Sequence, residues 1–181
     1  MDEMRSAGGE QMARRRYFYG ETFVSRSASI SPFREVTNMF LGEYQHVVDD
    51  KGRISIPAKF RTALKGGAVV TRGLDRSLVV YAMREWKILA EKLASLPISE
   101  QNSRAIARLM LAGAMDVAVD GQGRIAVPEY LRQYAGLKKS VVVAGLYNRL
   151  EIWDGEAWSS YKNKTEGESN AIAENLSALG I

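Results

Sequence analysis

An internal repeat restricts what this sequence can fold into more than any other feature. Residues 46–61 align with residues 117–132 at a constant offset of 71 positions. The residues identical in the two copies include Asp49, Gly52, Arg53, Ile54, Pro57 and Arg61, which match Asp120, Gly123, Arg124, Ile125, Pro128 and Arg132. The similarity resumes further along the chain at an offset of 72 positions, where Trp86 aligns with Trp158. This agreement predicts a duplicated structural unit.

Each copy contains a predicted tight turn between two segments rich in β-branched residues. Asp49 and Gly52 hold the first and fourth positions of one turn, and Asp120 and Gly123 hold those of the other. Asp at the first position favours a type I turn, and glycine at the fourth can adopt the positive φ that closes it. The sequence therefore predicts one β-hairpin in each unit.

A short helix is predicted after each hairpin. Pro57 and Pro128 suit the first helical position, where the missing N–H costs nothing. Gly66 and Gly136 are expected to end these helices. The apolar residues expected on their buried sides are Phe60, Ala63 and Leu64 in the first unit and Leu131, Tyr134 and Ala135 in the second.

Two apolar strands are expected after each short helix, at residues 68–71 and 78–81 and at residues 140–143 and 150–153. Longer helices are indicated by apolar residues at i, i+3, i+4 and i+7, which we expect to lie in the core: Trp86, Leu89, Ala90 and Leu93, then Ile106, Leu109, Met110 and Gly113. The pattern predicts an α+β chain, mainly β, built from two tandem repeats with flanking helices.

The domain organisation follows from the repeat. We expect a flexible N-terminal extension over residues 1–38, a first repeat with its connecting helices over 39–115, and a second repeat over 116–161. Residues 162–181 form an acidic C-terminal tail, either a weak helix or a loose segment. A second interpretation of the extension is that Met39 is the true initiator.

Composition and charge exclude several classes of function. The chain has no cysteine, so disulfides, thiolate metal sites and a cysteine nucleophile are excluded, and a reducing cytoplasm is the simplest compartment. No segment approaches the roughly 18 consecutive apolar residues of a membrane helix, and the start lacks the layout of a secretory signal. Residues 51–149 carry 17 Lys or Arg against 7 Asp or Glu, which favours a polyanionic partner such as nucleic acid.

The predicted turns carry the candidate binding residues. Arginine offers paired donors to guanine and glutamine can pair with adenine, so Lys51 and Arg53 in the first turn and Gln122 and Arg124 in the second are candidate base contacts. A competing interpretation is that each arginine only pairs with the aspartate of its own turn. Both hold if the carboxylate orients the guanidinium that DNA engages.

Basic residues on the outward side of the short helices are candidate phosphate contacts. Arg61 and Arg132 occupy equivalent positions in the two units, and Lys59 precedes Arg61. Phosphate contacts position a protein on DNA without reading its sequence. Solvated helix charge explains the same pattern equally well.

These motifs resemble the MraZ family. Two Asp-x-x-x-Arg turns about 70 residues apart each run into Ile-x-[Ile/Val]-Pro-x-x-[Phe/Leu]-Arg, and residues 39–44 read Met-Phe-Leu-Gly-Glu-Tyr. The resemblance covers Met39 to about Tyr161 and implies an AbrB-like (SpoVT-AbrB) swapped-hairpin barrel of double-psi type. It also makes Asp49, Arg53, Asp120 and Arg124 the motif residues, with Gln122 where relatives often carry a basic residue.

The resemblance further implies a transcriptional regulator of the division and cell-wall gene cluster. It would bind direct repeats in the promoter of its own operon, act on double-stranded DNA in the nucleoid, and form ring-like homo-oligomers. It implies no cofactor, no small-molecule substrate and no membrane partner.

Two other functions compete with this one. An enzyme is disfavoured, because the single histidine, His46, is not part of a Ser/His/Asp pattern. His46, Asp49 and Asp50 could be imagined as metal ligands, but their position at the edge of a hairpin explains them better. A protein-binding module of the same hairpin class, like an antitoxin whose tail grips its partner, remains the alternative. The acidic segment 166–174 is the feature in its favour.

Overall fold

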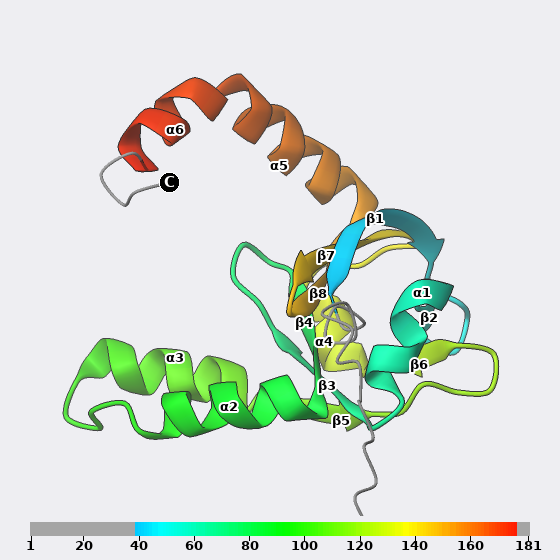
Figure 1. The fold of residues 1–181 in the computed structure, drawn as a ribbon, viewed down its shortest axis with the longest axis horizontal. Coiled ribbons are helices and arrows are strands. Elements are labelled where there is room, and N and C mark those ends of the chain that lie inside the picture. The colour runs from blue at the N-terminus through cyan, green and yellow to red at the C-terminus, as the bar shows by residue number, and fades with distance from the viewer. Residues whose placement is uncertain (1–38, 177–181) are drawn as a thin grey trace, which may run out of the picture. The chain divides into compact units, whose positions relative to one another are not determined.

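The computed structural model describes residues 39–176, and the expected N-terminal extension over residues 1–38 and the segment 177–181 lie outside the described residues. The elements, shown in Figure 1, are β1 (Phe40–Val47), β2 (Arg53–Ser55), α1 (Ala58–Arg61), the 3₁₀ helix η2 (Thr62–Leu64), β3 (Ala68–Arg72), β4 (Leu78–Ala82), α2 (Met83–Ala94), α3 (Gln101–Leu111), β5 (Met115–Val117), β6 (Arg124–Ala126), α4 (Glu129–Tyr134), β7 (Ser140–Tyr147), β8 (Arg149–Asp154), α5 (Gly155–Gly167) and α6 (Ser169–Leu176). The predicted α+β class, mainly β, is confirmed.

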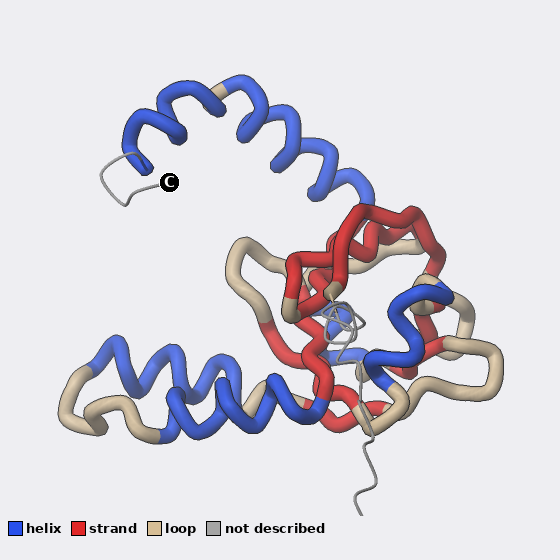
Figure 2. The backbone as a smooth tube through the Cα atoms, in the orientation of Figure 1, coloured by secondary structure: helices blue, strands red, loops and turns tan. Residues whose placement is uncertain are grey.

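Strand pairing interlocks the two repeats. A six-stranded antiparallel sheet has the order β1-β7-β8-β4-β3-β5, and a separate two-stranded ribbon pairs β2 with β6 (Figure 2). If each strand is replaced by its counterpart in the other repeat (β1 by β5, β3 by β7, β4 by β8, and the reverse), the same order results, read from the opposite edge. The first strand of each repeat pairs with the other repeat, β1 with β7 and β5 with β3. The implied exchange of strands between the units is therefore present within one chain.

The turns form as the sequence predicts, but the hairpins do not extend beyond them. Gly52 and Gly123 have φ of +72° and +80°, and their N–H groups donate to the carbonyls of Asp49 and Asp120 at 2.8 Å. Beyond the first turn only a single bridge, Val48 to Ile54, joins the flanking segments. The two sides then separate, because β1 and β2 each pair with a strand of the other repeat.

One hydrophobic core fills the space between the sheet and the ribbon. Ile54 and Ile125 contribute from the ribbon and Phe60 and Leu131 from the short helices. Phe60 also packs edge-on against Phe40 of β1, with ring centroids 5.2 Å apart. The predicted buried faces of both short helices are confirmed, and both repeats share the same interior.

The short helices begin one residue later than predicted. Pro57 and Pro128 are the capping residues before α1 and α4, with extended ψ of 133° and 147°. Their carbonyls accept the first helical hydrogen bonds, from Phe60 and Leu131. Each proline thus ends the preceding extended segment, and this extended backbone excludes it from the helix itself.

The predicted apolar stripes on α2 and α3 do not belong to the main core. Of the α2 stripe only Leu93 is buried, whereas Trp86 and Leu89 are partly exposed. The two helices lie side by side (Figures 1 and 2); they contact each other, α2 also contacts β3 and β4, and α3 also contacts β3. A pair of helices can bury only the sides that face each other or the sheet, so most of the stripe residues stay partly exposed.

The tail from residue 162, for which the sequence left a weak helix or a loose segment open, is helical in α5 and α6 as far as Leu176, apart from a turn at Glu168. Asp154, only 6% exposed, caps α5 by accepting the backbone N–H groups of Glu156 and Ala157. Trp158 and Tyr161 of α5 pack against each other and against Trp153 of β8. Among the helices of the described segment, none combines the length and the apolar character needed to cross a bilayer.

Candidate nucleic-acid interface

The first turn is organised around the carboxylate of Asp49. One oxygen, Oδ1, accepts the backbone N–H groups of Lys51 and Arg53 at 3.0 and 2.9 Å. The other, Oδ2, accepts Nε of Arg53 at 2.7 Å and lies 2.7 Å from its Nη2. The Arg53 guanidinium and these backbone donors lower the pKa of Asp49 to about 2. The aspartate is therefore ionised at neutral pH and fixes the direction of the arginine.

The second turn repeats this arrangement. Asp120 accepts the N–H groups of Gln122 and Arg124 at 2.9 Å each, and the Arg124 side chain donates to it at 3.0 and 2.8 Å. Hydrogen bonding to Arg124 lowers the pKa of Asp120 to about 2. The pairing of each arginine with its own aspartate, one of the two interpretations from the sequence, is present in both units.

The two turns form one charged network. Nη1 of Arg124 lies 3.6 Å from Oδ2 of Asp49, so an arginine of the second repeat reaches the aspartate of the first. The pKa of Arg53 is raised, first by its hydrogen bond to Asp49 and further by the more distant charge of Asp120. Antiparallel pairing of β2 with β6 brings the motifs together, since Ser55 lies opposite Arg124.

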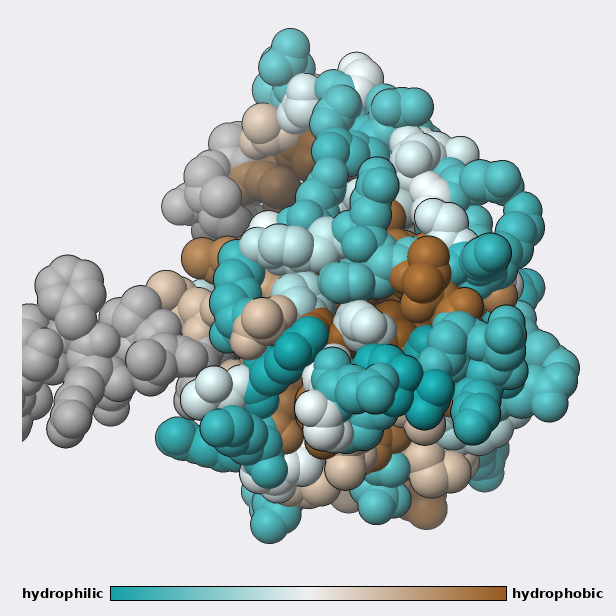
Figure 3. Space-filling view, turned by 90° about the vertical axis from the view of Figure 1, so that its right-hand side faces the viewer, coloured by the Kyte–Doolittle hydropathy of each residue, from teal (hydrophilic) through white to brown (hydrophobic). Residues whose placement is uncertain are grey.

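Lys51 and Gln122 form the exposed tips of the turns, whereas both arginines are partly covered, with 29% of the Arg53 side chain and 20% of the Arg124 side chain exposed. Figure 3 looks onto the side of the molecule where Figure 1 shows the two loops that carry these turns. Hydrophilic side chains cover most of this face, with small hydrophobic patches between them. Such a surface suits a polar, charged ligand.

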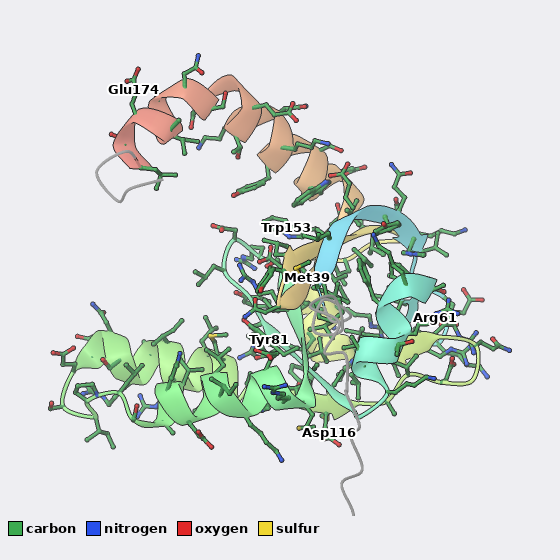
Figure 4. All side chains as sticks on the ribbon, viewed as in Figure 1. Met39, Arg61, Tyr81, Asp116, Trp153 and Glu174 are labelled. Atoms are coloured by element: carbon green, nitrogen blue, oxygen red, sulfur yellow. The ribbon has the colours of Figure 1, made fainter. Side chains whose placement is uncertain are left out.

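Arg61 and Arg132 do not point outward as the sequence suggested. Each is partly buried against the turn glycine of the other repeat, Arg61 against Gly123 and Arg132 against Gly52. Nε of Arg61 donates to the carbonyl of Ile56 at 2.8 Å. Figure 4 shows Arg61 on the side of the molecule that carries the turns. The reason is the strand exchange, which brings each short helix beside the opposite turn.

Lys59 is exposed but has intramolecular contacts. Its ammonium donates to the carbonyl of Leu41 at 2.7 Å and lies 4.8 and 4.9 Å from the ring centres of Tyr44 and Phe60. An ammonium has three donors, so this contact leaves others available.

The arrangement offers oriented hydrogen-bond donors. Because Arg53 uses Nε and Nη2 for Asp49, its Nη1 group keeps donors for a ligand. Within residues 39–176, no three His, Asp or Glu side chains are grouped to hold a metal ion. The geometry fits recognition of a ligand that presents hydrogen-bond acceptors.

The contact between each short helix and the opposite turn was missed from the sequence. A signal was available, because Arg61 and Arg132 are identical in the two copies, as are Gly52 and Gly123. Identity between copies indicated that these residues matter. Their partners became apparent only with the strand exchange.

Comparison with known proteins gives a consistent result. The model of the family described as "MraZ protein, putative antitoxin-like" matches twice, over residues 39–109 and 110–178. Proteins named "Transcriptional regulator MraZ" from Herpetosiphon aurantiacus, Acetivibrio thermocellus and Halothermothrix orenii are 48%, 48% and 49% identical over 143 residues, which is 79% of this chain and 100% of each relative. Two tandem matches cover most of the chain, the first containing β1 to β4 and the second β5 to β8. The chain belongs to the MraZ family.

Proposed function

We propose that this chain is a DNA-binding transcriptional regulator that reads base edges with its two turns. The observation that carries the proposal is the convergence of two arginines, each fixed by its own aspartate, in one network on a hydrophilic face. Preorganised guanidinium groups lose little entropy on binding and present the paired donors that guanine accepts. The name of the relatives supports a role in transcription.

Each candidate residue has a defined role in this proposal. Arg53 and Arg124 contact base edges, while Lys51 and Gln122 extend the contact from the tips of the turns. Lys59 contacts phosphate through the donors that Leu41 does not use. The two turns are unequal, because Lys51 brings a charge and Gln122 does not.

The resemblance supplies the finer parts of the proposal. The bound DNA would be direct repeats in the promoter of the chain's own division and cell-wall gene cluster, with autoregulatory repression as the outcome. The protein would be cytoplasmic and nucleoid-associated and would act as a ring-like homo-oligomer on successive repeats. The repeats would span residues 39–115 and 116–161, followed by the tail from residue 162.

A mobility-shift assay on the promoter upstream of the chain's own gene tests this function. We expect the intact protein to bind this DNA and the double variant Arg53→Ala with Arg124→Ala to lose the specific complex. A matched control removes two exposed arginines from the helices, Arg84→Ala with Arg108→Ala, which changes the net charge by the same amount. Unchanged binding by the first pair of substitutions would refute the proposal.

A protein-binding role is the second candidate. The family description includes "antitoxin-like", and α6 exposes the apolar side chains of Ile172 and Leu176. If deletion of residues 162–181 removes a stoichiometric protein partner but leaves DNA binding intact, the tail carries this second function.

A further inference from the structure

We propose that Arg61 and Arg132 are positioning residues that act across the repeats, each holding the reading turn of the other repeat. The inference rests on the proposed DNA-reading role of the turns, which it deepens by naming what aims them. Arg132, on α4 of the second repeat, supports the turn of Asp49 to Arg53. Arg61, on α1 of the first repeat, supports the turn of Asp120 to Arg124.

Direct contact with the turn glycines is the first line of support. A Cβ atom added to Gly52 would lie 2.6 Å from Cζ of Arg132, so the guanidinium rests on the glycine itself. A Cβ atom added to Gly123 would meet the guanidinium of Arg61 even more closely. Both glycines are buried and have positive φ, so they serve the turn and also make room for the arginine.

Backbone hydrogen bonds tie the same partners together. The N–H of Val127 donates to the carbonyl of Gly52 at 3.0 Å, and the N–H of Ile56 donates to the carbonyl of Gly123 at 2.8 Å. Each turn is thus held by the strand end that leads into the opposite short helix. The arginine of that helix then covers the glycine from the side.

The two supports differ in strength. Nε of Arg61 donates to the carbonyl of Ile56, and the N–H of Ile56 donates to the carbonyl of Gly123. These two hydrogen bonds connect α1, the residue after β2 and the second turn. Nε of Arg132 is buried without a hydrogen-bond partner, so packing alone holds this side chain in place. The second turn is therefore the more firmly held of the two.

The functional consequence is a dependence of each turn on the other repeat. A recognition side chain has to be held within about 0.5 Å and 10–20° of its productive geometry. Loss of Arg132 would misdirect Lys51 and Arg53 directly, whereas it would reach Arg124 only through the longer 3.6 Å contact with Asp49. A direct phosphate contact would act differently, since its loss weakens binding to all sequences and reduces the salt slope by about 1.

Hydrogen–deuterium exchange of the DNA-free protein tests the structural half of the inference. We expect Arg132→Met to speed exchange of the amides of residues 49–53 and to leave residues 120–124 unchanged, and Arg61→Met to do the reverse. Arg84→Met, on the exposed side of α2, is the control. Faster exchange in the turn of the same repeat, in both turns equally, or in neither would overturn the proposal.

Double-mutant cycles in quantitative DNA binding test the functional half. Arg132→Met should lower specific affinity about 10-fold, within the usual range for coupled neighbours, at an unchanged salt slope. In the Arg53→Ala background, Arg132→Met should lower the affinity only slightly further. In the Arg124→Ala background, it should lower the affinity by the same factor as in the otherwise unchanged protein. If the changes in binding free energy are additive in both cycles, or if the salt slope falls, the positioning role is overturned.

A second pair of variants covers the case in which a methionine substitution unfolds the protein. Arg132→Lys and Arg61→Lys keep the charge but remove the planar guanidinium, and the same exchange pattern is expected from them. The failures are distinguishable: intact binding by Arg53→Ala with Arg124→Ala refutes the DNA-reading role, whereas the exchange pattern alone decides whether the arginines hold the opposite turns.

Discussion

Ile54 of the first repeat lies directly opposite Ile125 of the second in the β2–β6 ribbon, and neither residue has any solvent-exposed surface. Each isoleucine directly follows the arginine of its Asp-x-x-x-Arg turn. Their contact in the core therefore sets the spacing of Arg53 and Arg124 on the surface. Stability and recognition depend on the same three-residue strands.

Truncation of this pair is expected to destabilise the fold. Ile54→Ala or Ile125→Ala should lower the free energy of unfolding by about 2–5 kcal/mol, the usual cost of deleting a buried isoleucine side chain. Urea denaturation followed by circular dichroism measures this. Ile98→Ala is the matched control, because Ile98 is 82% exposed and its loss should change stability by no more than about 0.5 kcal/mol. Equal losses for buried and exposed positions would contradict the assigned core.

The aspartates of both turns are expected to titrate far below their ordinary range. Hydrogen bonds from Arg53 and Arg124 lower the pKa values of Asp49 and Asp120 from 3.8 to about 2. A lowered pKa stabilises the folded state, fully above pH 3.8, and this contribution is lost as the pH falls toward 2. Carboxyl NMR titration should give midpoints near 2 for both residues. In Arg53→Ala the midpoint of Asp49 should move back toward 3.8, while that of Asp120 should stay low.

The cap of α5 is expected to contribute measurably to stability. Asp154 accepts the N–H groups of Glu156 and Ala157 and also the backbone N–H of Lys138, at 3.1 Å. Asp154→Ala removes all three bonds and should cost about 1–2 kcal/mol, with α5 loosened first. Thermal denaturation gives the loss, and Asp154→Asn should recover part of it. Asp116→Ala, at an exposed position, is the control. A loss no larger than that of the control would argue against the cap.

Lys59 is expected to contribute to DNA affinity without contributing to sequence preference. Lys59→Ala should weaken binding to specific and random DNA alike and reduce the slope of log affinity against log salt by about 1. Binding isotherms at several salt concentrations measure both effects. Lys92→Ala, on the distant helix α2, should leave the slope unchanged. A loss confined to the specific site would instead indicate that Lys59 reads bases or only supports the fold.

Local structure could be predicted well from the sequence, and the long-range pairing could not. The turn at Asp49 to Gly52 and the strands after each short helix follow from local preferences that the structure keeps. The pairing of β1 with β7 is a choice among several apolar strands of similar composition, and no local signal distinguishes them. The family resemblance implied an exchange of strands, but the sequence did not show which residues it brings together, so the position of Arg61 was predicted wrongly.

The candidate site shows the same division. The pairing of Asp49 with Arg53 lies within one turn and could be proposed from spacing. The contact of Arg124 with Asp49 crosses the repeats, so the single four-residue network was not foreseen. The prediction that the apolar stripes of α2 and α3 lie in the core was wrong for another reason. A period of 3.6 shows which side of a helix is apolar, but it does not show how much of the protein covers that side.

The interlocked strands also determine how this surface can change during evolution. Two identical subunits joined by a two-fold axis carry every surface residue twice, and their symmetry suits a palindromic target. In this chain the strand order keeps that symmetry, but the two turns are encoded by separate codons, so one carries Lys51 and the other Gln122. A single mutation can therefore alter one half of the surface and leave the other unchanged, which frees the molecule to match an asymmetric ligand.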